Sequence, residues 1–174
     1  MKSYFLLVVF SFSMLSLAAQ KKLKMTVSAS SDTVYSTSEQ RLYVRPSSKL
    51  SISEHLKSTM YRSRRGFMLG FSIQTGRTNL FTISAGSIAE IRLSDGEKVF
   101  LETLGSRESK GSVLGYGSFT FTSYTLNRDQ LEKLKNADVK SIRINTSAGN
   151  FDYEIKDKFA SVIGDQVRRI ENAF

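Results

Sequence analysis

The chain of 174 residues contains no cysteine and no tryptophan, and it has a single histidine and a single proline. The absence of cysteine excludes thiol nucleophiles, redox-active thiol pairs and thiolate metal sites. Because His55 is the only histidine, a zinc site has only carboxylates to complete it, and we expect neither a metal nor another cofactor. A Ser-His-Asp mechanism needs the same histidine as its base, and the sequence contains no Gly-x-Ser-x-Gly turn. We therefore expect no catalytic residue and interpret His55 as an ordinary exposed or half-exposed side chain.

The first twenty residues have the layout of a secretory signal peptide. Lys2 gives a positive start, an uncharged apolar run follows over residues 4–15, and Ser16 and Ala18 place small side chains at the cleavage position. The apolar run is short for a membrane-spanning anchor, which is the less favoured alternative. We therefore predict a signal peptide over residues 1–19, no transmembrane segment after cleavage, and a periplasmic or extracellular location.

Residues 20–174 have the length of one domain, and without disulfides that domain depends on its hydrophobic core alone. Short segments rich in branched and aromatic residues are separated by turn residues, which is typical of β-strands. We expect strands near residues 24–27, 33–35, 41–44, 67–74, 79–84, 117–124, 140–146 and 151–155.

Three segments have helical patterns. Residues 53–65 place Leu56 and Met60 on one helical face. A short helix follows Asn127, which is the expected N-cap, and Gln130 is placed to complete a capping box. A C-terminal helix has a stripe of apolar residues expected to be buried: Phe159, Ile163, Val167, Ile170 and Phe174.

The order of these elements predicts the fold class. Strands and helices do not alternate along the chain, which argues against a parallel α/β sheet. We expect a mainly β (α+β) fold, either an antiparallel β-sandwich or a curled sheet, with a short capped helix and a C-terminal amphipathic helix.

The stretch IRLSDGEKVFLETL, residues 91–104, predicts a hairpin with a three-residue loop. Gly96 occupies the loop position that needs the left-handed conformation. The odd loop length places Ile91 opposite Val99 on the core side of the sheet. The same parity puts four charged side chains on the solvent side: Glu90, Arg92, Lys98 and Glu102.

Two segments carry a resemblance to known proteins. Residues 91–101, IRLSDGEKVFL, contain a DG hairpin, and residues 124–155, YTLNRDQLEKLKNADVKSIRINTSAGNFDYEI, contain a Leu-x-x-x-x-Leu-x-x-Leu helix and a Val-Lys-x-Ile-Arg strand. Over residues 88–174 this order is similar to that of small exported proteins of Bacteroidota-type bacteria. The resemblance implies export and a fold of this kind. Its motifs are structural, so it transfers no activity and no site residue.

Two pairs of carboxylates are candidates for glycoside hydrolysis, which uses paired acidic residues. Glu90 and Glu102 share the solvent face of the first hairpin, and Asp152 and Glu154 share the outer face of a second hairpin with Arg143. Mixed charges are the ordinary arrangement on the solvated face of a sheet. A small glycan hydrolase is therefore the alternative function, and the wet face of a hairpin is the favoured interpretation.

The positive charge of the mature chain lies entirely in its first half. Residues 20–80 contain eleven Lys or Arg and three acidic residues, whereas residues 81–174 contain thirteen of each. The segment MYRSRRG, residues 60–66, is one of the densest basic points in this half. It offers a candidate site for an anionic ligand, made of Tyr61, Arg62, Arg64 and Arg65.

These features together predict a non-enzymatic exported domain with a binding or structural role in the cell envelope. An anionic envelope polymer, such as an acidic glycan, or an anionic lipid headgroup fits both the charge and the compartment. Nucleic acid fits the charge, but export argues against it as the partner. A protein that pairs with an exposed edge strand is a further alternative.

Overall fold

The computed structural model describes residues 23–27, 33–46, 53–76, 79–111 and 117–172. The predicted signal peptide over residues 1–19, residues 112–116 and Phe174 lie outside these ranges. Among the described residues, no helix is both long enough and apolar enough to cross a membrane.

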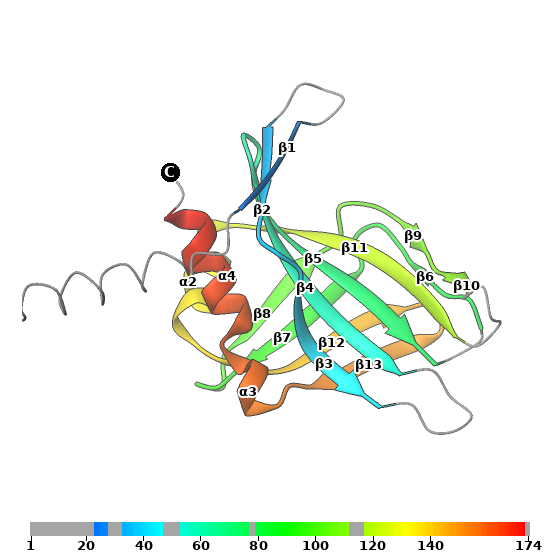
Figure 1. The fold of residues 1–174 in the computed structure, drawn as a ribbon. Helices are drawn as coiled ribbons and strands as arrows, with labels where there is room; N and C mark the ends of the chain where they lie inside the picture. Colours follow the sequence, from blue (N-terminus) through cyan, green and yellow to red (C-terminus); the bar gives the residue numbers. More distant parts are fainter. Residues whose placement is uncertain (1–22, 28–32, 47–52, 77–78, 112–116, 173–174) are drawn as a thin grey trace, which may run out of the picture.

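Two antiparallel sheets form most of the molecule, which confirms the mainly β prediction (Figure 1). The large sheet has the order β1-β2-β4-β5-β11-β10, with β3 also paired to β4. It contains β1 (Lys24–Val27), β2 (Thr33–Ser36), β3 (Gln40–Arg45), β4 (Glu54–Ser63), β5 (Gly66–Thr75), β10 (Lys110–Gly111) and β11 (Ser118–Leu126). The small sheet has the order β13-β12-β7-β8 and contains β7 (Ile88–Leu93), β8 (Lys98–Glu102), β12 (Val139–Thr146) and β13 (Gly149–Glu154). A separate pair joins β6 (Thr82–Ile83) to β9 (Arg107–Glu108).

The two sheets approach each other at both edges, so the structure is a curled sheet around one core. At one edge, a β-bridge joins Thr103, which follows β8, to Tyr124 of β11. At the other edge, the Tyr43 ring of β3 packs edge-on against the Tyr153 ring of β13, with the ring centroids 5.2 Å apart. The antiparallel curled sheet expected from the sequence is therefore present.

The core lies between the inner faces of the two sheets, where every second residue of a strand points inward. Leu56 of β4 is the partner of Ile73 of β5, and both side chains are buried. The buried rings of Phe71 and Tyr124 pack edge-to-face with their centroids 5.6 Å apart. Such pairs add directional contacts of about 0.5–1.5 kcal/mol to the burial of apolar area.

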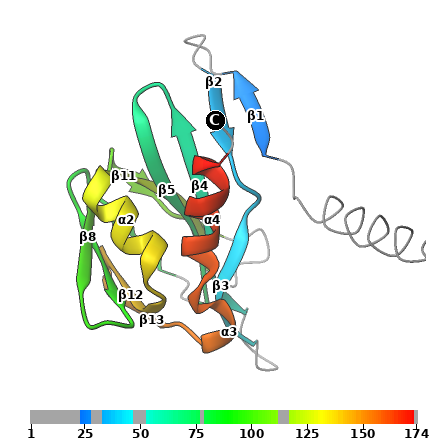
Figure 2. The same ribbon diagram turned by 90° about the vertical axis from the view of Figure 1, so that its left-hand side faces the viewer.

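Three helices lie together on one side of the curled sheet (Figure 2). They are α2 (Arg128–Asn136), α3 (Asp157–Ala160) and α4 (Val162–Glu171). Helix α4 contacts β3 and β4, and α2 contacts α4 and β8. The expected C-terminal helix is present as two pieces separated at Ser161, and its stripe of Ile163, Val167 and Ile170 is buried as predicted.

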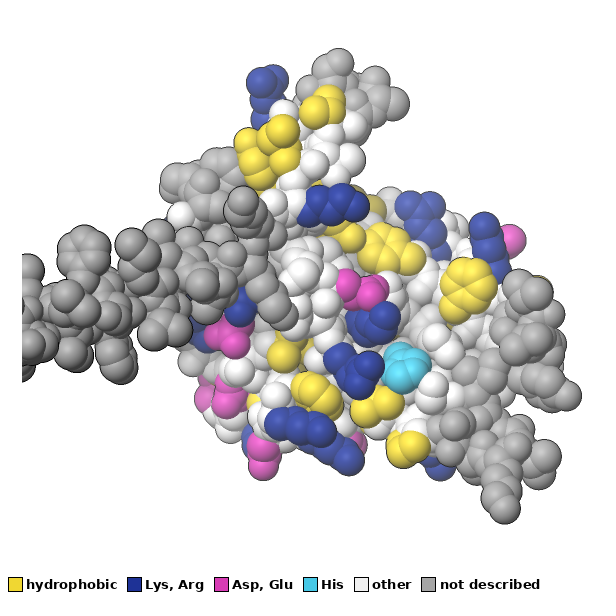
Figure 3. Space-filling view, viewed as in Figure 1, with side chains coloured by type: hydrophobic (Ala, Val, Ile, Leu, Met, Phe, Trp, Pro, Cys, Tyr) yellow, Lys and Arg dark blue, Asp and Glu magenta, His cyan; other side chains and the backbone are white. Residues whose placement is uncertain are grey.

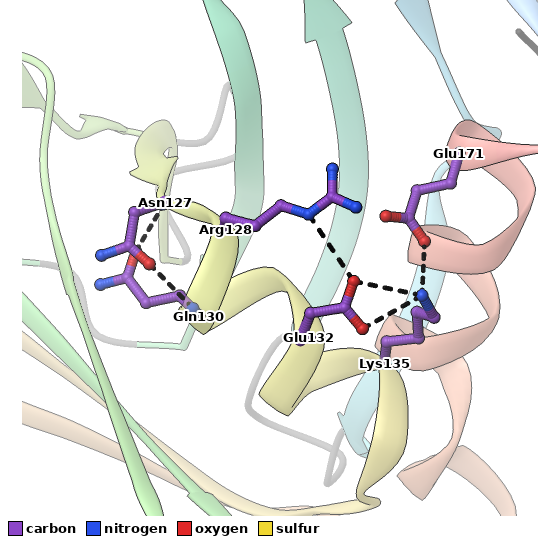
Figure 4. A network of polar contacts seen from close by, with 6 residues as sticks. All are labelled: Asn127, Arg128, Gln130, Glu132, Lys135 and Glu171. Atoms are coloured by element: carbon purple, nitrogen blue, oxygen red, sulfur yellow. Dashed lines mark hydrogen bonds and ion pairs between the residues drawn. The ribbon is translucent and has the colours of Figure 1, made fainter.

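Helix α2 is held by the capping box that the sequence predicted (Figure 4). The Gln130 amide donates to Asn127 Oδ1 at 2.8 Å, and the Asn127 amide donates to Gln130 Oε1 at 2.8 Å. Gln130 Nε2 also donates to the Phe100 carbonyl of β8 at 2.7 Å. At the other end of α2, Lys135 Nζ forms an ion pair with Glu171 of α4 at 3.0 Å. The helix is therefore tied both to the small sheet and to α4.

The predicted register of the first hairpin is confirmed. Ile91 is the partner of Val99, and Gly96 has a φ of +90° in the loop between them. A local turn rule and the parity of the apolar residues were sufficient to set this register. In the second hairpin, Ile142 is the partner of Tyr153 across a two-residue loop, which places Arg143 opposite Asp152 on the outer face as predicted.

The prediction of a helix over residues 53–65 is wrong, because this segment is strand β4. Leu56 and Met60 are both buried as predicted, but a spacing of four residues also fits one face of a strand. The prediction for residues 79–84 is confirmed only for the two residues of β6, which pair with β9 and not with β5.

Gln166 connects α4 to β4 inside the core. Its side chain is 1% exposed. Its Nε2 donates to the Ser58 carbonyl at 2.9 Å and to the Ser38 carbonyl at 3.2 Å. The Ser58 hydroxyl donates to Gln166 Oε1 at 2.7 Å. One glutamine therefore satisfies the hydroxyl and carbonyl of Ser58 in β4 and the carbonyl of Ser38 between β2 and β3.

Replacing Gln166 by leucine (Gln166→Leu) is expected to lower the free energy of unfolding by at least about 2 kcal/mol. Each buried polar group that loses its partner costs about 1–3 kcal/mol, and leucine can satisfy none of the three. Urea denaturation measures the change. The control Arg169→Ala, on the exposed side of α4, should stay within about 0.5 kcal/mol of the unmodified chain. Equal stability of the two variants would contradict this role of Gln166.

Candidate functional site

The predicted basic segment lies at the end of β4 and in the turn that leads to β5. The turn consists of Arg64 and Arg65, which are both exposed. Arg62 belongs to β4, and it shares the face of the large sheet on which Met60 is buried. Tyr61 lies between them in the sequence and therefore points to the opposite face.

Arg62 and Arg64 line one pocket with a volume of about 300 Å³, which we term the arginine pocket. Its described lining is Thr33, Tyr35, Arg62, Ser63 and Arg64. Tyr35 of β2 is the Cα partner of Arg62, and Thr33 follows on the same face of β2. The lining therefore offers two guanidinium groups and three hydroxyls and no carboxylate. This composition suits a phosphate or a carboxylate, which guanidinium groups bind through paired hydrogen bonds.

Neighbouring groups hold this pocket in shape. The Arg62 Cζ atom lies 5.3 Å from the centre of the Phe67 ring, within the range of a cation–π contact. The Arg65 amide donates to the Ser63 hydroxyl at 3.1 Å and so closes the turn. Arg64 forms no ion pair with a carboxylate of the described residues. Its charge is therefore available to a ligand.

Strand β1 adds exposed apolar side chains beside the arginine pocket. Met25 is the partner of Tyr35 and Val27 is the partner of Thr33, so these side chains share the face of the pocket. Their exposed fractions are 62% and 61%. Surfaces that bind anionic lipid headgroups typically combine basic side chains with exposed apolar ones.

The structure separates Tyr61 from the arginines with which the sequence analysis grouped it. Its ring lies on the outer face of the large sheet, edge-on to the Phe121 ring at a centroid distance of 6.3 Å. Burial raises the pKa of its hydroxyl. Thr33 and Tyr35 take its place in the pocket, and the sequence contained no signal for them because they come from a different strand.

The outer face of the large sheet carries a second depression, of about 240 Å³, which we term the outer-face groove. Its lining is Glu39, His55, Lys57, Ser72, Ile73, Gln74, Phe119, Thr120 and Phe121. Figure 3 shows this face, where the single histidine (cyan) lies among dark blue Lys and Arg side chains and yellow hydrophobic ones. The sequence analysis did not identify Phe119 and Phe121 as candidates.

His55 is a half-buried residue of β4 in the outer-face groove. Its Nε2 lies 2.7 Å from the Ser53 hydroxyl. Burial, together with the positive charges of Arg41 and Lys57, lowers the pKa of its imidazole below the ordinary value of 6.5. The imidazole is therefore neutral at pH 7, beside two cations.

One carboxylate of each pair considered for hydrolysis forms an ion pair with a cation. Glu90 forms an ion pair with Lys98 at 2.8 Å, and this contact holds the pKa of Glu90 below its ordinary value. Asp152 accepts a hydrogen bond from Arg143 Nε at 2.6 Å. A glycosidase needs one carboxyl group with a raised pKa as its general acid, and the shift of Glu90 has the opposite direction.

Neither a metal site nor a similar protein indicates the function. The described parts of the chain contain no group of three or more His, Cys, Asp or Glu side chains placed to hold a metal ion. Comparison with protein-family models, with curated proteins and with solved structures gave no match. The function is therefore inferred from the physical chemistry of the two surfaces.

Acidification is expected to destabilise the chain more than it destabilises the variant His55→Gln. Because the pKa of His55 is lowered in the folded state, the unfolded chain binds the proton more readily. The stability that depends on the neutral imidazole is complete above about pH 6.5 and is lost as the pH falls through the folded-state pKa. Urea unfolding at about pH 7.5 and about pH 5 measures this loss. An equal loss in the glutamine variant would show that other groups are responsible.

Proposed function

We propose that this chain is an exported, non-enzymatic domain that binds the anionic headgroup of an envelope lipid through the arginine pocket. The observation that carries the proposal is the convergence of Arg62 and Arg64 on one pocket whose described lining contains no carboxylate. The exposed Met25 and Val27 beside it favour a lipid as the source of the anion, because they can enter the headgroup region while the arginines contact the phosphate.

The sequence supports the envelope location in this proposal. The first nineteen residues have the layout of a signal peptide, and the order of motifs over residues 88–174 resembles that of exported Bacteroidota proteins. Envelope lipids offer phosphate groups at high density on a surface. The negative potential of such a surface also attracts basic segments toward it.

Replacing both pocket arginines (Arg62→Ala with Arg64→Ala) is expected to weaken binding to anionic vesicles by about thirtyfold. A basic residue near an anionic membrane surface contributes about 1 kcal/mol, and two such residues together contribute about 2 kcal/mol. The measurement is co-sedimentation of the chain from residue 20 onward with vesicles of phosphatidylglycerol and phosphatidylcholine. Binding should weaken as salt is raised from about 0.02 M to about 0.5 M.

Controls separate the pocket from general charge. Arg92→Ala with Arg169→Ala removes the same charge from exposed positions outside the pocket and should leave binding close to that of the unmodified chain. Equal losses in the two double variants would contradict a specific pocket. The double variant Met25→Ser with Val27→Ser should bind vesicles more weakly. Inorganic phosphate should still compete with the vesicles for the arginine pocket of this variant. If phosphate binds and vesicles do not, the anion comes from a soluble source.

A further inference from the structure

The outer-face groove lies on the opposite face of the large sheet from the arginine pocket. Its sides are formed by residues that are partners across three strands, β4, β5 and β11. Two rows cross it: His55, Gln74 and Phe119 form one, and Lys57, Ser72 and Phe121 form the next. Each row thus contains a histidine or lysine, a neutral polar side chain and a phenylalanine.

Beside this groove, strand β11 exposes aromatic side chains and buries threonines. Phe119 and Phe121 point outward with exposed fractions of 49% and 40%. Thr120 and Thr122 point inward and are buried. A sheet strand normally buries the aromatic residues and exposes the threonines. This register leaves two aromatic rings on the solvent side of the sheet.

The far end of β11 explains how the reversed register is maintained, and what it costs. Tyr124 and Leu126 are buried, and Tyr124 packs on Phe71, so a slip of one residue would expose them. The register that buries them leaves the hydroxyl of Ser118 buried without a hydrogen-bond partner among the described residues. A buried hydroxyl without a partner destabilises the folded state. Local rules that a fold breaks at a stability cost are concentrated at functional sites.

The exposed rings rest on bare backbone. Gly70 of β5 lies beneath the Phe121 and Tyr61 rings, and a Cβ atom there would come within 2.7 Å of Phe121 Cζ and 2.9 Å of Tyr61 Cε2. The absence of a side chain lets the two rings settle edge-on at an interplanar angle of 83°. By contrast, Phe100 is a single exposed ring on the small sheet, which is common on protein surfaces.

Positive charge collects at one side of these rings. Arg41 of β3 is the direct partner of Lys57 of β4, and like charges in this position destabilise a sheet. Glu39 forms an ion pair with Lys57 at 2.8 Å, but Arg41 has no ion pair with a described carboxylate. An anionic group bound at this place would relieve the repulsion.

We propose that the outer-face groove binds a short segment of an acidic, uronate-type oligosaccharide. The apolar faces of the sugar rings lie against Phe119 and Phe121, and a sugar carboxylate lies toward Arg41 and Lys57. Gln74 and Ser72 are placed to exchange hydrogen bonds with sugar hydroxyls. This inference uses none of the residues of the arginine pocket and does not depend on the function proposed for it.

The groove favours a glycan over a nucleic acid, although both stack on aromatic rings. Glu39 lies in the lining, where its carboxylate would repel a phosphate backbone but can accept hydrogen bonds from sugar hydroxyls. A ligand with many hydroxyls fits a surface that has few cations and several neutral polar groups.

Calorimetric titration of the purified protein with a short oligogalacturonate tests the proposal. Binding is expected, and the carboxyl-reduced oligosaccharide should bind about tenfold more weakly because it lacks the charge that Arg41 recognises. Phe119→Ser with Phe121→Ser should weaken the binding of both sugars by at least about tenfold. Arg41→Gln should remove the difference between the two sugars.

Matched variants keep the test specific. Phe100→Ser removes an equally exposed ring from the small sheet and should bind as the unmodified protein does. Arg62→Ala with Arg64→Ala should also bind normally, so a failure of the arginine pocket and a failure of the groove are distinguishable. The proposal is overturned if neither sugar binds, if the serine double variant binds equally well while remaining folded by circular dichroism, or if single-stranded oligothymidylate displaces the sugar and binds more tightly.

Discussion

The register of β4 is the constraint on which the rest of the structure depends. This strand pairs with β2 and β3 along one edge and with β5 along the other. Ser58 points inward, where its hydroxyl and carbonyl are both bonded to Gln166. A slip of one residue would bring Lys57 or Thr59 to this buried amide and move every side chain of the strand to the opposite face. The Ser58–Gln166 contact therefore helps to decide which face carries the arginines and which carries the groove.

Elements whose determinants lie within a few residues could be predicted from the sequence. The partnership of Ile91 with Val99 follows from one loop length, and the cap of α2 follows from Asn127 and its neighbour three positions later. Strand β4 has no such local signal. Leu56 and Met60 satisfy the helical period and the strand period equally, and the turn after β4 has two arginines at its centre, with a glycine, Gly66, only at its end. Pairing along both edges decides the structure, and that pairing cannot be read from the segment itself.

The strand structure of β4 also determines which residues of the basic segment lie together. A helix places Tyr61 beside Arg64, three positions later, whereas a strand places Arg62 and Arg64 on one face and Tyr61 on the other. Composition was sufficient to locate the charge in the sequence, but the partner Tyr35 comes from a neighbouring strand. The exposed rings of β11 had a signal that was readable in advance, because the two phenylalanines and the following tyrosine and leucine have opposite parity. A strand cannot bury the phenylalanines together with Tyr124 and Leu126 on one face. The two phenylalanines are exposed, which makes them candidates for a binding surface.

The two faces of the large sheet differ in how firmly their binding groups are held. The Phe121 ring has few rotatable bonds and packs against Tyr61 over bare backbone, so binding a sugar orders little that is not already ordered. Arg62 is restrained by Phe67, but Arg64 lies in an exposed turn and must be ordered by its ligand. The contact of sugar rings with the phenylalanines should therefore depend weakly on salt. The attraction of a phosphate by the arginines of the pocket should depend on salt strongly. The large sheet thus presents packed aromatic rings of β11 on one side and the adaptable charge of Arg64 on the other.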